Sequence, residues 1–122
     1  MKMIQEKGEG SYRIRAYQGG RVLINQSEYA TSVIVTLTEL MTDWAPQRVS
    51  EIEPGHIEEI LALEPEIILL GTGTVQQFPS REVMKTAIQR GVGLEVMDTG
   101  SACRTFNLLM AEGRRVAAAL MV

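Results

Sequence analysis

The stretch that decides the fold is residues 94–122, LEVMDTGSACRTFNLLMAEGRRVAAALMV. Its pattern predicts a strand over residues 94–97, a helix from about Ser101 to Glu112 and a closing strand from Arg115 to Met121. The polar turn of residues 98–101 joins the first strand to the helix. Such a turn in an α/β protein exposes free backbone N–H groups and can hold a ligand.

A second unit of the same kind precedes this stretch. Residues 67–70, IILL, are apolar on both faces, which is typical of a central strand covered on two sides. Gly71-Thr72-Gly73-Thr74 ends this strand, and residues 80–91 have the N-cap, apolar stripe and glycine stop of a helix. The spacing predicts parallel strands on either side of that helix. Further upstream, Pro54 opens another helix, and residues 48–49 allow a short strand.

The first 40 residues have a different character. Apolar and polar side chains alternate from residue 12 to residue 17, and the chain returns over residues 21–25, so we predict a hairpin. Residues 26–29 are interpreted as a turn, and the β-branched residues 32–38 as a third strand. We expect a small antiparallel β unit here, with residues 1–11 frayed.

Composition limits the classes of function. The 122 residues suit one domain, residues 1–122, with 45% hydrophobic and 22% charged residues. The net charge of −3 argues against nucleic acid or an anionic lipid surface as the main partner. No apolar run reaches the roughly 20 residues of a membrane span. The single Cys103 excludes an internal disulfide, and with no secretory signal at the start we expect a cytoplasmic protein.

The candidate binding site lies at two strand ends. The loops of residues 71–74 and 98–101 form one rim if their strands are neighbours, and ligands of open α/β sheets bind at such carboxyl ends. Arg104 and Asn107 follow on one face of the last helix, where a guanidinium group could bind an anion. The alternative is that Asp98 and Thr99 only cap the helix, that the glycines only permit tight turns and that Arg104 pairs with a surface carboxylate. The residues of this hypothetical ligand site are Gly71, Thr72, Gly73, Asp98, Thr99, Gly100, Arg104 and Asn107.

No catalytic or metal-binding set is evident, so we assign no catalytic residue, metal or cofactor. Gln76 stands where a dinucleotide fingerprint needs its third glycine. Cys103 lies on the apolar stripe of its helix, which favours a buried inert thiol over a nucleophile paired with His56. His56, the only histidine, is interpreted as a solvent-facing helix residue. The lone Trp44 is interpreted as a core residue, with an exposed recognition residue as the alternative.

The sequence resembles a family of small bacterial and archaeal proteins of unknown function. The family also includes mitochondrial assembly factor 3 of respiratory complex I and an adipogenesis-associated vertebrate protein. Four stretches carry the resemblance: Gly71-Thr72-Gly73, Asp98-Thr99, Cys103 to Asn107 and Glu112 to Leu120. It implies a three-layer α/β fold in which the N-terminal antiparallel β unit packs with a central mixed five-stranded sheet covered by helices. The family has no established enzymatic activity and no catalytic residues that the resemblance could transfer to this sequence.

Two functions follow as hypotheses. The first is a non-enzymatic protein-interaction or assembly-factor-like domain that binds protein partners still to be identified. The second is a protein, or an enzyme, that binds an anionic metabolite at the Gly71–Thr74 and Asp98–Arg104 loops. We expect a monomer or a weak homodimer, because the apolar closing strand could pair with a copy of itself if it lay at a sheet edge.

Overall fold

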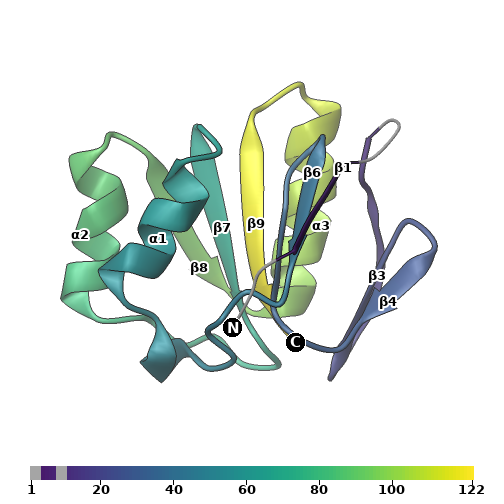
Figure 1. Ribbon diagram of the computed structural model, residues 1–122, viewed down its shortest axis with the longest axis horizontal. Coiled ribbons are helices and arrows are strands. Elements are labelled where there is room, and N and C mark those ends of the chain that lie inside the picture. Colours follow the sequence, from purple (N-terminus) through teal and green to yellow (C-terminus); the bar gives the residue numbers. More distant parts are fainter. Residues whose placement is uncertain (1–3, 8–10) are drawn as a thin grey trace.

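The computed structural model describes residues 4–7 and 11–122, which form two sheets and three α-helices (Figure 1). The larger sheet has six strands in the order β1 (Ile4–Lys7), β6 (Glu39–Thr42), β5 (Val33–Val35), β9 (Val116–Met121), β7 (Ile67–Thr72) and β8 (Gly93–Met97). The smaller sheet has three antiparallel strands, β2 (Ile14–Gln18), β3 (Arg21–Ile24) and β4 (Ser27–Tyr29). The helices are α1 (Pro54–Leu61), α2 (Arg81–Gln89) and α3 (Thr99–Ala111).

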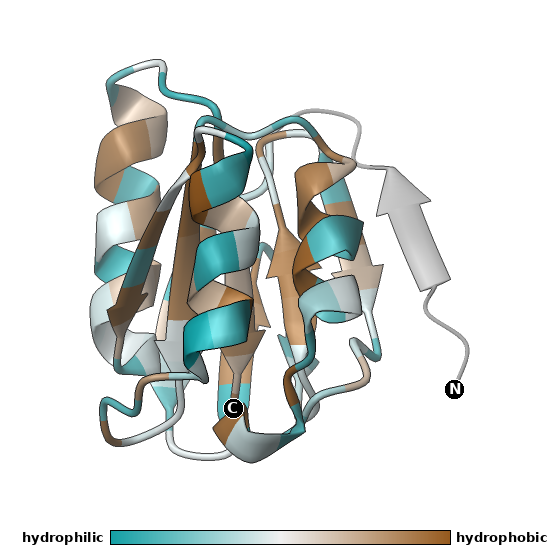
Figure 2. Cartoon of the chain, turned by 90° about the vertical axis from the view of Figure 1, so that its left-hand side faces the viewer, coloured by the Kyte–Doolittle hydropathy of each residue, from teal (hydrophilic) through white to brown (hydrophobic). Residues whose placement is uncertain are grey.

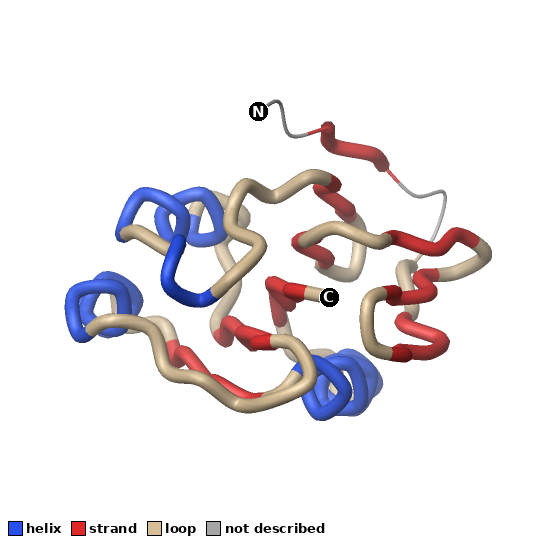
Figure 3. Tube along the Cα trace, turned by 90° about the horizontal axis from the view of Figure 1, so that it is seen from below, coloured by secondary structure: helices blue, strands red, loops and turns tan. Residues whose placement is uncertain are grey.

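The parallel strands β8, β7 and β9 form the centre of the fold. Helix α2 connects β7 to its neighbour β8. Helix α3 then leads from β8 to β9, which is the neighbour of β7 on its other edge. Because such connections are right-handed, two steps in opposite directions across a sheet put their helices on opposite faces. Figure 3 shows the helices on both sides of the strands.

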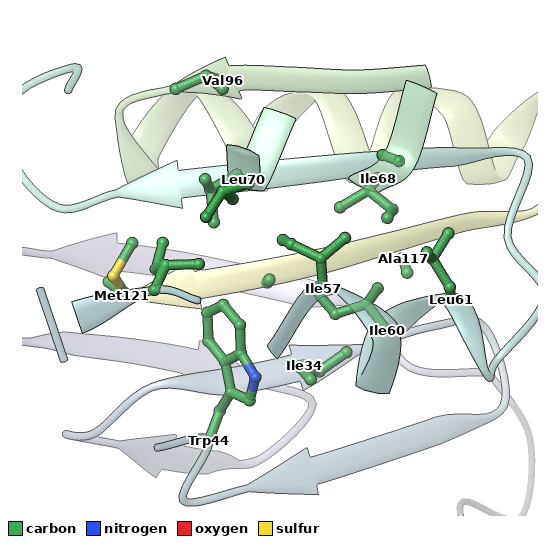
Figure 4. Packing of buried hydrophobic residues seen from close by; sticks show 14 of the residues in the cluster. Ile34, Trp44, Ile57, Ile60, Leu61, Ile68, Leu70, Val96, Ala117 and Met121 are labelled. Atoms are coloured by element: carbon green, nitrogen blue, oxygen red, sulfur yellow. The ribbon is translucent and has the colours of Figure 1, made fainter. Parts of the chain in front are cut away.

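Each face of the large sheet has its own hydrophobic core. Along β7, Ile68 and Leu70 face α1 and α2, whereas Leu69 faces α3 and the small sheet, as expected for alternating strand side chains. Figure 4 shows Ile57 of α1 in the same cluster as Ile68 and Leu70 of β7. On the opposite face, Phe106 of α3 is fully buried. In Figure 2 the hydrophobic colour concentrates on the strands, and the hydrophilic colour on the outer surfaces of the helices.

The predicted α/β class and the three-layer arrangement are confirmed. One layer holds α1 and α2, the second is the mixed sheet, and the third combines α3 with the small antiparallel sheet. The five expected strands of the mixed sheet are β6, β5, β9, β7 and β8, and β1 adds a sixth beside β6. Residues 4–7 therefore form a strand although residues 1–11 were predicted to be frayed; residues 1–3 and 8–10 lie outside the described residues.

Three assignments in the first 50 residues were wrong. The strand within residues 32–38 belongs to the large sheet, where β5 pairs with β9 and β6 and its three side chains are buried. Residues 27–29 form β4, the third strand of the small sheet, although a turn was expected there. Residues 48–49 are not a strand, since a 3₁₀ turn spans Val49–Glu51.

The closing strand β9 is central, with β5 on one side and β7 on the other. Its six side chains are all buried. Both of its edges are hydrogen-bonded within the chain, so β9 is not available to pair with a second copy.

Candidate functional site

The structure brings the two predicted loops together. Strands β7 and β8 are parallel neighbours, and their register pairs Gly71 with Met97 at the carboxyl ends. The loops after these strands therefore lie at one rim, beside the first turn of α3. The predicted proximity of the two strand ends is confirmed.

This rim is closed by its own hydrogen bonds. The Thr99 N–H donates to the Gly73 carbonyl (2.8 Å), and the Gly73 N–H donates to the Thr99 hydroxyl (2.7 Å). Gly73 has a φ of +89°, which only glycine adopts at little cost. A Cβ on Gly71 would lie 3.0 Å from the Cα of Thr99, so the strand needs glycine for this close approach. Gly71 and Thr99 are buried, so they support the rim by packing beneath it.

The remaining part of the β7–α2 loop is held against the sheet. The buried Thr72 hydroxyl lies 2.7 Å from the Val75 carbonyl and accepts a hydrogen bond from the Gln77 N–H at 3.1 Å. The Gln76 side chain donates to the carbonyl of Val96 in β8 at 2.9 Å. Hydrogen bonds within the loop and to β8 thus define the loop conformation.

Asp98 is the N-cap of α3. Its carboxylate accepts hydrogen bonds from the N–H and the hydroxyl of Ser101, both at 2.9 Å. The Ser101 N–H is the main cause that lowers the pKa of Asp98, and the charge of Arg104 adds to it. Arg104 is exposed and donates from Nη2 to the Ser101 hydroxyl at 3.2 Å. The capping alternative therefore describes Asp98 correctly.

Asn107 joins α3 to the small sheet. Its amide nitrogen donates to the Ile14 carbonyl at 2.6 Å, and its amide oxygen accepts from the Ile14 N–H at 3.2 Å. Both ends of the Asn107 side chain are therefore engaged with the backbone of β2. In this structure Asn107 acts as a structural contact between two elements.

A hollow of about 170 Å³ lies between β2 and α3, next to the rim. Of the predicted site residues, Gly100, Arg104 and Asn107 line it, and β2 supplies Arg15 and Tyr17. The β2 residues were missed because the predicted alternation put Tyr17 on the opposite face from Ile14. A β-bulge between residues 14 and 16 shifts the register, and only strand pairing reveals it.

The Tyr17 hydroxyl is buried and finds no hydrogen-bond partner among the residues that the structure describes. The nearby Thr99 hydroxyl already donates to the Met121 carbonyl and accepts from Gly73. Burial is the main cause that raises the pKa of Tyr17; the charges of Cys103 and Asp98 raise it further, while the Thr99 hydroxyl opposes the rise. The phenol therefore stays protonated at neutral pH.

Cys103 is buried, and burial raises the pKa of its thiol to about 12. The predicted burial of Cys103 is confirmed, and its low reactivity stays a prediction, because only the thiolate is a good nucleophile. Cys103 belongs to the core on the α3 side of the sheet, whereas His56 lies in α1 on the other side. The sheet therefore separates the two residues, and a Cys–His pair is excluded.

His56 differs from its prediction as a solvent-facing residue. It is half-buried: its Nδ1 accepts the N–H of Glu53 at 2.9 Å, and its ring packs edge-on against Trp44 at a centroid distance of 6.2 Å. Trp44 is fully buried, as the core interpretation predicted. Within residues 11–122, no group of three His, Cys, Asp or Glu side chains is arranged to hold a metal ion.

Comparison with known proteins identifies the family. A family model described as a protein of unknown function (DUF498/DUF598) matches residues 14–121. The chain belongs to this family. The resemblance inferred from the sequence is thereby confirmed.

Relatives include proteins with different names. The chain is 32% identical over 117 residues to the "13 kDa major membrane protein" of Francisella tularensis, covering 95% of each. It is 31% identical to the mouse NADH dehydrogenase [ubiquinone] 1 alpha subcomplex assembly factor 3, covering 86% of this chain and 69% of the relative. The solved structure of Xanthomonas campestris XCC1710 is 42% identical, with a TM-score of 0.85, and the match covers 92% of this chain and 85% of that one. In the described part of the chain, no helix is long and apolar enough to cross a membrane.

Proposed function

We propose that this protein is a non-enzymatic interaction domain, similar in role to an assembly factor, that binds its partner through the β7–α2 loop and the outer face of α2. One observation carries this proposal: large apolar side chains are exposed on a loop of defined conformation. Val75 and Phe78 lie in this loop and Ile88 in α2, with exposed fractions of 59%, 65% and 64%. Exposed aromatic and aliphatic side chains are the usual anchors of protein interfaces.

The preorganised loop favours binding. Thr72 and Gln76 already hold the loop in place, so little conformational entropy is lost when a partner binds. By contrast, a mobile loop would need to be ordered at the moment of association.

The charges beside this surface favour an acidic partner. Arg81, Lys85 and Ile88 share one face of α2, since residues four and seven positions apart lie close together on a helix. Arg81 and Lys85 form no ion pair with any residue that the structure describes. We expect the partner to present carboxylates around an apolar contact. The name of the mouse relative, an assembly factor, supports a role in binding other proteins.

Affinity purification from the native host tests this proposal. The wild-type tagged protein should capture a stoichiometric partner, and Phe78→Ala should weaken the reconstituted complex by roughly tenfold or more, as for a buried interface anchor. Leu108→Ala is the matched control, because Leu108 is 60% exposed but lies on α3, on the other face of the sheet. Equal loss in both variants, or repeated absence of a stoichiometric partner, would refute the proposal.

A second candidate function is binding of an anionic metabolite at the rim of the Gly71–Thr74 and Asp98–Arg104 loops. The hollow beside Gly100 and Arg104 favours it. The buried Gly71, Thr72 and Thr99 would support such a site from within, and the side chain of Arg104 would contact the ligand. A thermal-shift screen of phosphates and carboxylates, repeated with Arg104→Ala, tests this function.

A further inference from the structure

The hollow between β2 and α3 is small, with a volume of about 170 Å³. A phosphate group with its four oxygens fits this space.

The charged groups at this hollow all have one sign. Arg15 enters from β2 and Arg104 from α3, and no Asp or Glu among the described residues lines it. Neither arginine forms an ion pair with any residue of the described part, whereas three other arginines of the chain are each paired with a glutamate. Asp98, two residues before Gly100, has both carboxylate oxygens engaged by Ser101.

Strand β2 also supplies Tyr17 to the lining of the hollow. The bulge between residues 14 and 16 shifts the register of β2 ahead of Tyr17. The Tyr17 hydroxyl itself is buried, so the two guanidinium groups are the side-chain donors available to a ligand in the hollow.

We propose that this hollow binds a phosphate-sized dianion between the guanidinium groups of Arg15 and Arg104. Guanidinium groups bind phosphate and carboxylate in a bidentate way, and bonds between charged partners are the strong ones. This inference deepens the second candidate function and rests on it. It adds β2 to the site and defines the ligand as a phosphate group, either free or as a monoester.

The test is an amide NMR titration of the ¹⁵N-labelled full chain with inorganic phosphate, and with sodium chloride at matched ionic strength. The amides of Tyr17, Gly100 and Arg104 should shift in a saturable way with phosphate only. Arg15→Gln and Arg104→Gln should each weaken binding by roughly tenfold or more, the loss expected for a charge-assisted hydrogen bond. Arg21→Gln is the control, since Arg21 lies in the same small sheet but pairs with Glu28.

The outcomes separate the two levels of the proposal. If phosphate binding is lost in Arg104→Gln but unchanged in Arg15→Gln, the two-arginine site is wrong while metabolite binding at the rim stands. If chloride reproduces the shifts, or nothing saturates, both are wrong. Retained peak dispersion in each variant shows that it is folded. A parallel titration with glycerol phosphate identifies whether the free ion or the monoester binds more tightly.

Discussion

Replacing Asn107 with alanine is expected to lower the free energy of unfolding by about 1.5 kcal/mol and to loosen the small sheet. The side chain makes two hydrogen bonds to the backbone of Ile14, at 2.6 and 3.2 Å, and Ile14 is buried. Alanine leaves both backbone groups without a partner, at roughly 1–3 kcal/mol each. The lower part of that range applies because Asn107 itself is half-buried, and the better helix propensity of alanine offsets roughly 0.6 kcal/mol.

Urea unfolding and amide hydrogen exchange measure the two effects. The amides of β2 and β3 should exchange faster in Asn107→Ala, while those of β7 keep the protection of the central sheet. The control is Gln89→Ala in α2, because Gln89 is exposed and its side chain forms no hydrogen bond within the described residues. An Asn107→Ala protein within about 0.5 kcal/mol of wild type, with unchanged exchange in β2, would show that α3 does not hold the small sheet in this way.

Three further predictions concern the rim and the core. Gly71→Ala should destabilise the protein by about 1–3 kcal/mol, because the new Cβ would meet the Thr99 backbone at 3.0 Å; Gly93→Ala, whose nearest contact is at 3.9 Å, should be close to neutral in thermal unfolding. Cys103 should resist iodoacetamide at pH 8 until the protein unfolds. Burial raises the pKa of the Cys103 thiol from 9.0 to about 12. The stability that the protonated thiol contributes is therefore complete below pH 9 and falls as the pH rises toward 12, by about 1 kcal/mol at pH 10. Cys103→Ala should flatten this loss in urea titrations. Asp98→Ala should cost about 1 kcal/mol by loss of the N-cap, and because the pKa of Asp98 is lowered, the difference from wild type should shrink as the pH falls below about 4; a constant difference would contradict the role of its charge.

Much of the fold was predictable because hydrophobic periodicity is local. The four apolar residues 67–70 predicted a central strand, and β7 lies between β8 and β9. The N-cap residue Ser80 marked the start of α2. The last helix was predicted from about Ser101 but begins two residues earlier at Thr99, with Asp98 as its N-cap. The predicted rim followed from the order of elements, because parallel neighbours end at the same edge of a sheet.

The candidate site was only partly predictable. The sequence pointed to Arg104 and Gly100, which do line the hollow. It gave no sign that Thr99 would close the rim or that Asn107 would bind β2, because both contacts join residues far apart in the chain. The sequence indicated only weakly that Val75 and Phe78 are exposed, because they are two large apolar residues in a loop between a strand and a helix.

The sequence by itself determined the α/β class, the alternation of strands and helices along residues 67–121, and the helix caps. Each of these depends on residues within one or two turns of each other. Only the tertiary structure decided that β5 joins the large sheet, that a bulge turns Tyr17 toward α3, and that β9 lies in the centre. The physical reason is that strand pairing and register depend on backbone hydrogen bonds between distant segments. Any strand can form such bonds with several partners, and the packing of the whole core selects among them.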